Sequence, residues 1–88
     1  MLDNEKLMSV LPILRREYDA AVAKHPSFPG NAPEAVCLIT EELGELAQEI
    51  NDIFECVPGA QERALIEAAH VAVTAIRTME MLKNGGAK

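Results

Sequence analysis

The sequence predicts an all-α fold in which one chain of three helices completes a four-helix-type bundle by homo-oligomerisation. Three segments of the 88 residues repeat apolar side chains with helical period, and the only aromatic residues are Tyr18, Phe28 and Phe54. A core of Ala, Leu, Ile, Val and Met suits close-packed helices better than a sheet. A chain this short has a marginal core of its own. We therefore expect one domain over residues 1–88 that a metal, a disulfide or self-association stabilises.

The first predicted helix covers about residues 3–24. Its apolar positions recur every three to four residues, at Leu7, Leu11, Leu14, Tyr18 and Val22. Pro12 interrupts this pattern, which predicts a kink or a late start of the helix. Three prolines and a glycine then fall within residues 24–33 and mark the one clear loop of the chain.

The second predicted helix covers about residues 33–56. Asn31 followed three residues later by Glu34 is typical of a capping box at a helix start. Pro58 and Gly59 are expected to end the helix. Apolar residues alternate steps of three and four along its whole length, as in the seam of a helical bundle. This seam consists of Val36, Ile39, Leu43, Leu46, Ile50, Ile53 and Val57.

The third predicted helix covers about residues 61–83 and ends at Asn84, Gly85 and Gly86. Apolar residues cover nearly its whole circumference, which is typical of a helix surrounded by other helices. Two companion helices in one chain cannot surround it. We therefore expect a homodimer or a homotetramer.

Charge and cysteine content limit the partners of the chain. A net charge of −6 argues against binding a nucleic acid, but a metal ion would still allow a nucleotide. The chain contains no 18-residue apolar run and no signal peptide, so we expect no membrane partner and a cytoplasmic location. Cys37 and Cys56 would lie about 28 Å apart on one helix, too far for a disulfide. We expect both to be buried free thiols.

Four acidic residues form a stripe on the second predicted helix. They are spaced by three, four and three residues, and they lie within a sector of about 80° beside the apolar seam. Neighbouring acids repel one another unless water or a cation neutralises them. The stripe is therefore either a solvated face or part of a cation site. Its members are Glu42, Glu45, Glu49 and Asp52.

A polar stripe also runs along the otherwise apolar third helix, and long polar side chains in such a setting need partners. Facing Glu42 and Glu45 with Glu67 would gather carboxylates that need a cation or bind protons. Hard oxygen ligands of this kind suit Mg²⁺ or Mn²⁺. The alternative is a salt-bridge network in which Arg63 and Arg77 neutralise the acids. The stripe consists of Arg63, Glu67, His70, Thr74 and Arg77.

Two other features carry weaker signals. His25 lies in the loop, where it either contacts a ligand or is simply exposed. The Glu67-x-x-His70 pair is also a ligand pattern of di-iron bundles, but those bundles carry the pattern on two helices and it occurs once here.

The residues Glu41-Glu42-Leu43-Gly44-Glu45-Leu46, followed by Glu67-Ala68-Ala69-His70, resemble the signature of MazG-like all-α nucleoside triphosphate pyrophosphohydrolases. That signature is Glu-x-x-Glu on one helix and Glu-x-x-Asp on the next. The resemblance covers roughly Ala32 to Leu82. It implies metal-dependent hydrolysis of a nucleoside triphosphate to monophosphate and pyrophosphate, in nucleotide-pool house-cleaning, by a homodimer or homotetramer.

The resemblance also implies roles for individual residues. Glu42, Glu45, Glu67 and His70 would hold Mg²⁺ or Mn²⁺, with Glu42 and Glu45 catalytic. Of the substrate contacts, the resemblance implies the one by Arg77, and further contacts are expected from His25 in the loop and from Glu49 of the acidic stripe.

His70 departs from the family, which carries Asp there. Imidazole suits Mn²⁺, Fe²⁺ or Zn²⁺ better than Mg²⁺, so the change bears on both metal identity and activity. The alternative function is a degenerate MazG-like bundle that oligomerises or binds nucleotide without catalysis. Phosphoribosyl-ATP pyrophosphatases, with a similar Glu-x-x-Asp helix, are a more distant resemblance.

Overall fold

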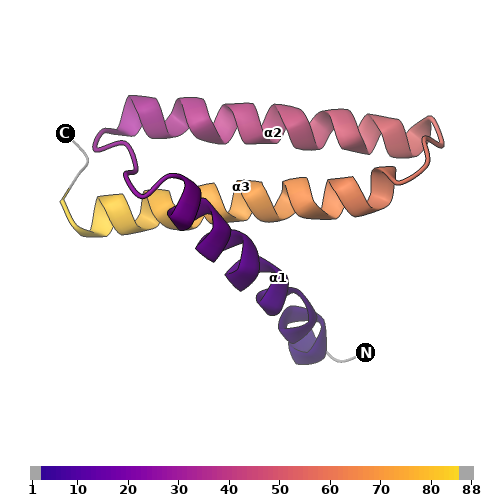
Figure 1. Cartoon of the computed structure of the whole chain (residues 1–88), viewed down its shortest axis with the longest axis horizontal. Coiled ribbons are helices and arrows are strands. Elements are labelled where there is room, and N and C mark those ends of the chain that lie inside the picture. The colour runs from indigo at the N-terminus through magenta and orange to yellow at the C-terminus, as the bar shows by residue number, and fades with distance from the viewer. Residues whose placement is uncertain (1–2, 86–88) are drawn as a thin grey trace.

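The computed structural model describes residues 3–85 and contains three α-helices and no strand within that range. These helices are α1 (Asp3–Lys24), α2 (Ala32–Phe54) and α3 (Ala60–Lys83). α2 and α3 lie side by side and antiparallel, and α1 packs against α3 (Figure 1). The predicted all-α class and its three helices are confirmed.

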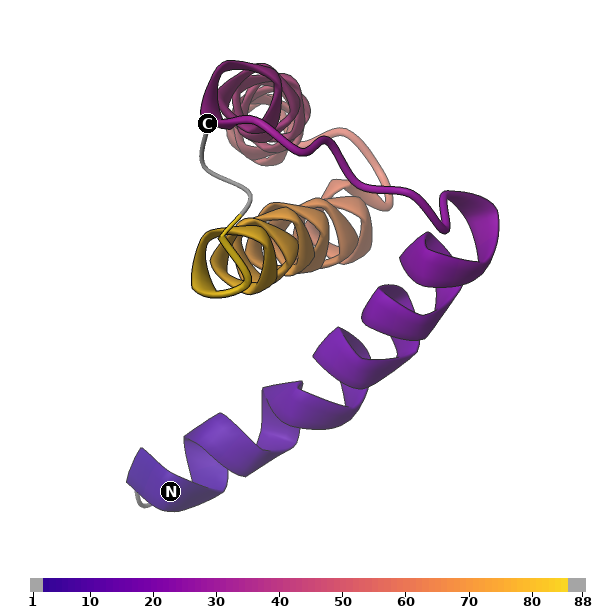
Figure 2. The ribbon, with the colours of Figure 1, turned by 90° about the vertical axis from the view of Figure 1, so that its left-hand side faces the viewer.

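α1 is anchored to the rest of the molecule by one end. The helix begins at Asp3 and includes Pro12, which excludes the late start, one of the two effects expected of this proline. Near its C-terminal end, the Tyr18 hydroxyl donates a hydrogen bond of 2.7 Å to the carboxylate of Glu80 on α3. The N-terminal half instead runs away from the α2–α3 pair (Figures 1 and 2). Only the C-terminal half of α1 is therefore placed to contribute to a site on α3.

The ends of α2 follow local backbone chemistry. The Asn31 side chain accepts a hydrogen bond of 3.0 Å from the Glu34 N–H, which confirms the Asn31 half of the predicted capping box. The helix ends at Phe54, two residues earlier than expected, because Cys56 adopts a left-handed backbone with φ of 58°. Gly59, with φ of 78°, then completes the reversal and precedes α3.

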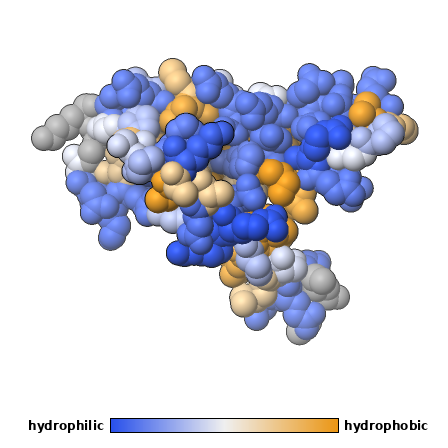
Figure 3. All heavy atoms as spheres, viewed as in Figure 1, coloured by the Kyte–Doolittle hydropathy of each residue, from blue (hydrophilic) through white to orange (hydrophobic). Residues whose placement is uncertain are grey.

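The core within one chain is small. Its buried apolar residues are mostly alanines, which let the helix backbones approach closely, and within residues 3–85 no large side chain is fully buried. Much of the predicted α2 seam is exposed, with Val36 at 59%, Leu43 at 53% and Ile50 at 43%. Hydrophobic side chains are correspondingly visible on the surface in Figure 3. The buried apolar residues are Ala35, Ala60, Ala64, Ala69 and Val73.

The dimensions of the chain also indicate incomplete packing. Its radius of gyration is 14.4 Å, against about 12 Å for a compact domain of this length. Its accessible surface is 6282 Å², against about 5,100 Å² for a compact protein of this mass. The chain therefore exposes about 1,200 Å² more surface than a compact monomer would.

The predictions about the two cysteines are only partly right. Cys37 and Cys56 are free, as expected, but both are exposed, so the expected burial is wrong. They lie outside the narrow alanine-rich contact between α2 and α3. Within residues 3–85, no helix combines the length and apolar character needed to cross a membrane.

Candidate metal centre

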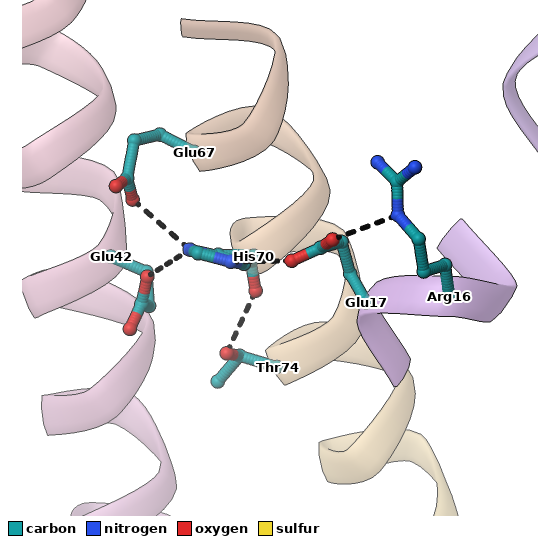
Figure 4. A network of polar contacts seen from close by, with 6 residues as sticks. All are labelled: Arg16, Glu17, Glu42, Glu67, His70 and Thr74. Carbon is teal, nitrogen blue, oxygen red and sulfur yellow. Dashed lines mark hydrogen bonds and ion pairs between the residues drawn. The ribbon is translucent and has the colours of Figure 1, made fainter. Parts of the chain in front are cut away.

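Three side chains from α2 and α3 converge near the middle of the helix pair. Each of Glu42, Glu67 and His70 offers one ligand atom, and these atoms lie within 4.8 Å of one another. The His70 Nδ1 atom lies 3.3 Å from Glu67 Oε2 and 3.7 Å from Glu42 Oε2 (Figure 4). Glu67 and His70 share a face because they are three residues apart on one helix. Close packing of the helices then brings Glu42 opposite them.

α1 contributes a fourth member of this cluster, Glu17. Its Oε1 atom lies 2.9 Å from His70 Nε2, and its Oε2 atom accepts a hydrogen bond of 3.3 Å from Arg16 (Figure 4). Glu17 is not among the site residues predicted from the sequence. In the sequence, Glu17 is marked only by its place beside Tyr18 at the border of the apolar stripe of α1. That place does not indicate which residue it contacts. The contact arises from the way α1 crosses α3.

The contact with Glu17 defines the chemistry of the imidazole. We assign the Nε2–H as the donor to Glu17, which in the neutral ring leaves the Nδ1 lone pair facing Glu42 and Glu67. A histidine that binds a metal through one nitrogen commonly donates its other N–H to a carboxylate in this way. The arrangement therefore fits a metal ligand held in one orientation.

The carboxylate of Glu42 lacks full compensation. Its Oε2 atom is shielded from solvent and has no hydrogen-bond partner among the described residues. Burial, reinforced by the negative charge of Glu45, raises the pKa of Glu42 above its ordinary value. A buried carboxylate oxygen in this state gains stability from a proton or a cation.

Protonation of His70 compensates part of the negative charge. Burial opposes its protonation, but hydrogen bonds to Glu17 and Glu67, together with the negative charges of Glu67 and Glu42, outweigh burial and raise the pKa of His70. The hydrogen bond from His70 in turn lowers the pKa of Glu17, against a smaller opposing effect of burial. One imidazolium, with Arg16 paired to Glu17, would leave one negative charge of the three carboxylates Glu17, Glu42 and Glu67 uncompensated. The donor set of two carboxylates and one imidazole fits Mn²⁺, Fe²⁺ or Zn²⁺ at least as well as Mg²⁺.

A cavity of about 560 Å³ adjoins the cluster. Glu17, Glu42 and His70 contribute to its acidic side, and the loop between α1 and α2 contributes Phe28 and Pro29. The volume is typical of a small-molecule site, for which roughly 300–1,000 Å³ is common. Three basic residues, His25, Lys24 and Arg77, also line this cavity.

The remaining predicted site residues lie in different surroundings. Glu45 is exposed and lies outside the converging group, although it is near enough to Glu42 to influence its pKa. Glu49 forms an ion pair of 2.9 Å with Arg63, beside a smaller cavity of about 250 Å³. The expected salt-bridge network is thus right for Arg63, but Arg77 packs over the Phe28 ring at 5.0 Å.

Comparisons of the chain with protein-family models, with curated proteins and with solved structures find no match. The MazG-like resemblance stays a prediction made from the motif residues. The convergence of Glu42, Glu67 and His70 beside a cavity is the observation from which a function is argued.

Proposed function

We propose that the chain is a metal-dependent hydrolase that converts a nucleoside triphosphate to a monophosphate and pyrophosphate. The observation that carries this proposal is the convergence of Glu42, Glu67 and His70 beside a cavity of small-molecule size. The shielded, unbonded Oε2 atom of Glu42 adds a reason for a cation at this point. The motif residues that resemble MazG-like enzymes supply the expected reaction.

Each residue has a distinct part in this proposal. Glu42, Glu67 and His70 would hold the divalent ion, Mg²⁺ or Mn²⁺, and Glu17 would orient the His70 ring through its Nε2–H. Glu45, one turn along α2 from Glu42, would act as a further ligand or accept a proton from the attacking water. When bound, the ion supplies polarisation of phosphate oxygens and activation of water.

The experiment is a screen of the purified protein against nucleoside triphosphates, with pyrophosphate release measured in Mg²⁺ and in Mn²⁺. We expect release that depends on metal and that disappears in Glu67→Gln. Glu62→Gln, in the first turn of the same helix, is the matched control and should retain activity. No release with any triphosphate in either metal would contradict the proposal.

A second candidate function has one specific observation in its favour. His70 hydrogen-bonds Glu17 and Glu67, so its protonated ring compensates part of the acidic cluster without any metal. A degenerate bundle that oligomerises or binds nucleotide without catalysis would use the cluster in this way. Its stability would then not respond to divalent ions, which distinguishes it from the first candidate.

We also infer that the working form is a homodimer or a homotetramer. Val36, Leu43 and Ile50 are exposed and lie seven residues apart, which is the spacing of a helix–helix seam. Covering the excess surface of about 1,200 Å² on each of two chains would bury about 2,400 Å² in total, a size typical of permanent dimers. Light scattering should give at least twice the chain mass of 9.6 kDa. A stable, folded monomer at micromolar concentration would contradict this inference.

A further inference from the structure

We infer that Arg77 forms an oxyanion subsite in the large cavity, which takes a phosphate group of the ligand and binds it without help from a metal ion. The inference rests on the proposed function only for the choice of phosphate and the identity of the whole ligand, a polyphosphate that extends from the acidic cluster to Arg77. Binding of a simple oxyanion at Arg77 is an independent claim.

The first observation is that Arg77 is mostly covered and yet unpaired. Arg77 is 9% exposed and is the one charged residue among residues 3–85 that is classed with the core. Within the same residues, its guanidinium forms no ion pair and no side-chain hydrogen bond, whereas Arg15, Arg16 and Arg63 each have a carboxylate partner. A guanidinium remains charged at any physiological pH and carries five N–H donors. Most of the side chain is covered, but its nitrogens are not among the atoms shielded from solvent, so the donors are open to water or to an anion that replaces it.

The surroundings of Arg77 leave those donors available. Phe28 lies with its ring centroid 5.0 Å from the guanidinium carbon, a cation–π contact that stabilises the charge but accepts no N–H hydrogen bond in the plane of the guanidinium. Phe28 belongs to the loop between α1 and α2 and lines the cavity beside Arg77. The loop therefore holds the arginine in place without satisfying its donors.

Two cavities border Arg77, and their charges differ. The smaller one, of about 420 Å³, contains Glu80, which repels an anion. The larger one, of about 560 Å³, adds Lys24, which attracts an anion, but also the acidic residues Glu17, Glu41 and Glu42. The larger cavity is the side on which one ligand could reach both Arg77 and the acidic cluster.

The acidic side of the same cavity limits where an anion can bind. Glu17, Glu41 and Glu42 line it and repel any anion that approaches without a cation. A metal-free anion is thus directed to Arg77. Planar guanidinium groups bind both phosphate and carboxylate groups through paired N–H donors, and the proposed nucleotide substrate selects phosphate of these two. A ligand with two or more phosphates would place one at Arg77 and another at the acidic cluster once that cluster is neutralised.

The test is calorimetric titration of the full chain with inorganic pyrophosphate in the presence of EDTA. We expect wild type to bind and Arg77→Met to bind at least about tenfold more weakly, since hydrogen bonds to a charged group are lost. Arg63→Met removes a cation of the same helix whose charge is already paired, and should bind like wild type. A nucleoside without phosphate should not compete, which assigns binding to the phosphate group.

Thermal unfolding without anion separates a ligand site from a structural role. If Arg77 is kept for a ligand, Arg77→Met removes an unpaired charge and should melt at the same temperature as wild type or higher. Arg77→Lys keeps the charge but loses the paired donors, and should bind pyrophosphate with intermediate affinity. A clear fall in melting temperature for Arg77→Met, together with wild-type affinity in Arg77→Lys, would overturn the inference.

Glu42→Gln keeps this inference separate from the proposed function. That variant should lose metal-dependent pyrophosphate release, yet bind pyrophosphate in EDTA as tightly as wild type or more tightly, because a repelling charge is gone. Undetectable binding in EDTA by both wild type and Glu42→Gln would contradict the anion subsite, whatever the outcome of the activity screen. Binding in EDTA by an inactive wild type would support the subsite and contradict only the enzyme.

Discussion

Two neighbouring stretches of the α2–α3 pair both place acidic side chains opposite basic ones, but only one of them pairs its charges. At one stretch, Arg63 lies 2.9 Å from the Glu49 carboxylate and also donates to the Pro58 carbonyl at 3.1 Å. One turn further along α3, Glu67 and His70 face Glu42, where carboxylates outnumber cations. In the first stretch each charged side chain has a partner of opposite charge, whereas in the second stretch negative charge is left without one.

The difference shows which polar residues the fold uses for its own stability. An exposed and fully paired arginine is an ordinary surface feature worth about 1 kcal/mol or less. A shielded carboxylate oxygen without a hydrogen-bond partner, as in Glu42, is unfavourable for the fold alone. The incomplete stretch is therefore the better candidate for a site that a ligand completes.

The largest expected effect is a loss of metal response at the incomplete stretch. Glu42→Gln removes one negative charge and one ligand oxygen, so millimolar Mg²⁺ or Mn²⁺ should no longer raise the melting temperature. Pyrophosphate release should fall by about 100-fold or more. Glu34→Gln, in the first turn of the same helix, is the matched variant and should keep both properties. Equal metal response in wild type and Glu42→Gln would remove the distinction between the two stretches.

His70→Asp should produce the next largest effect, because it replaces the internal cation with the family's residue. Without metal the change adds a negative charge beside Glu67 and Glu42, and should lower the free energy of unfolding by about 1–3 kcal/mol. Mg²⁺ should restore that stability and raise activity with Mg²⁺ relative to Mn²⁺. Melting temperature and pyrophosphate release, each with and without Mg²⁺, measure both effects. Destabilisation that metal does not reverse, without gain of activity, would favour the degenerate bundle.

A smaller effect is expected on the pH dependence of stability without metal. The raised pKa of His70 gives stabilisation that is complete below about 6.5 and is lost as the pH rises through its folded-state pKa. The lowered pKa of Glu17 gives stabilisation that is present above about 4.3 and is lost as the pH falls through its folded-state pKa. Stability from these two groups should therefore be greatest between about pH 4.3 and 6.5.

Thermal melts in EDTA from pH 4 to 9, on wild type and His70→Gln, measure this window. The difference in melting temperature between the two proteins separates the contribution of the histidine from that of the carboxylates. It should shrink as the pH rises above neutrality. A difference that grows toward alkaline pH would mean that His70 acts in its neutral form.

The smallest expected effect belongs to the paired stretch. Arg63→Met removes an exposed ion pair, and should lower the free energy of unfolding by less than about 1 kcal/mol. Chemical denaturation measures the change, and pyrophosphate release should stay at the wild-type level. A larger loss would mean that the Arg63 contact with the Pro58 carbonyl also stabilises the turn into α3.

Much of the local structure follows from the sequence because local chemistry determines it. The Asn31 cap, the apolar period of α2 and the glycine that precedes α3 place helix starts to within one residue. Spacing alone also puts Glu67 and His70 on one face of a helix. Such features depend on neighbours within about one turn, which the sequence displays directly.

Only tertiary structure decides which side chains meet between helices. Spacing treats Glu42 and Glu45 alike, but the packing of α2 on α3 brings Glu42 to His70 and leaves Glu45 exposed. Glu17 joins the cluster because α1 crosses α3 at His70, a contact between residues 53 positions apart in the sequence. Arg77 likewise turns from an expected partner of the acids into a buried cation against Phe28. The rotation and crossing of whole helices set these contacts, and no short stretch of sequence contains that information.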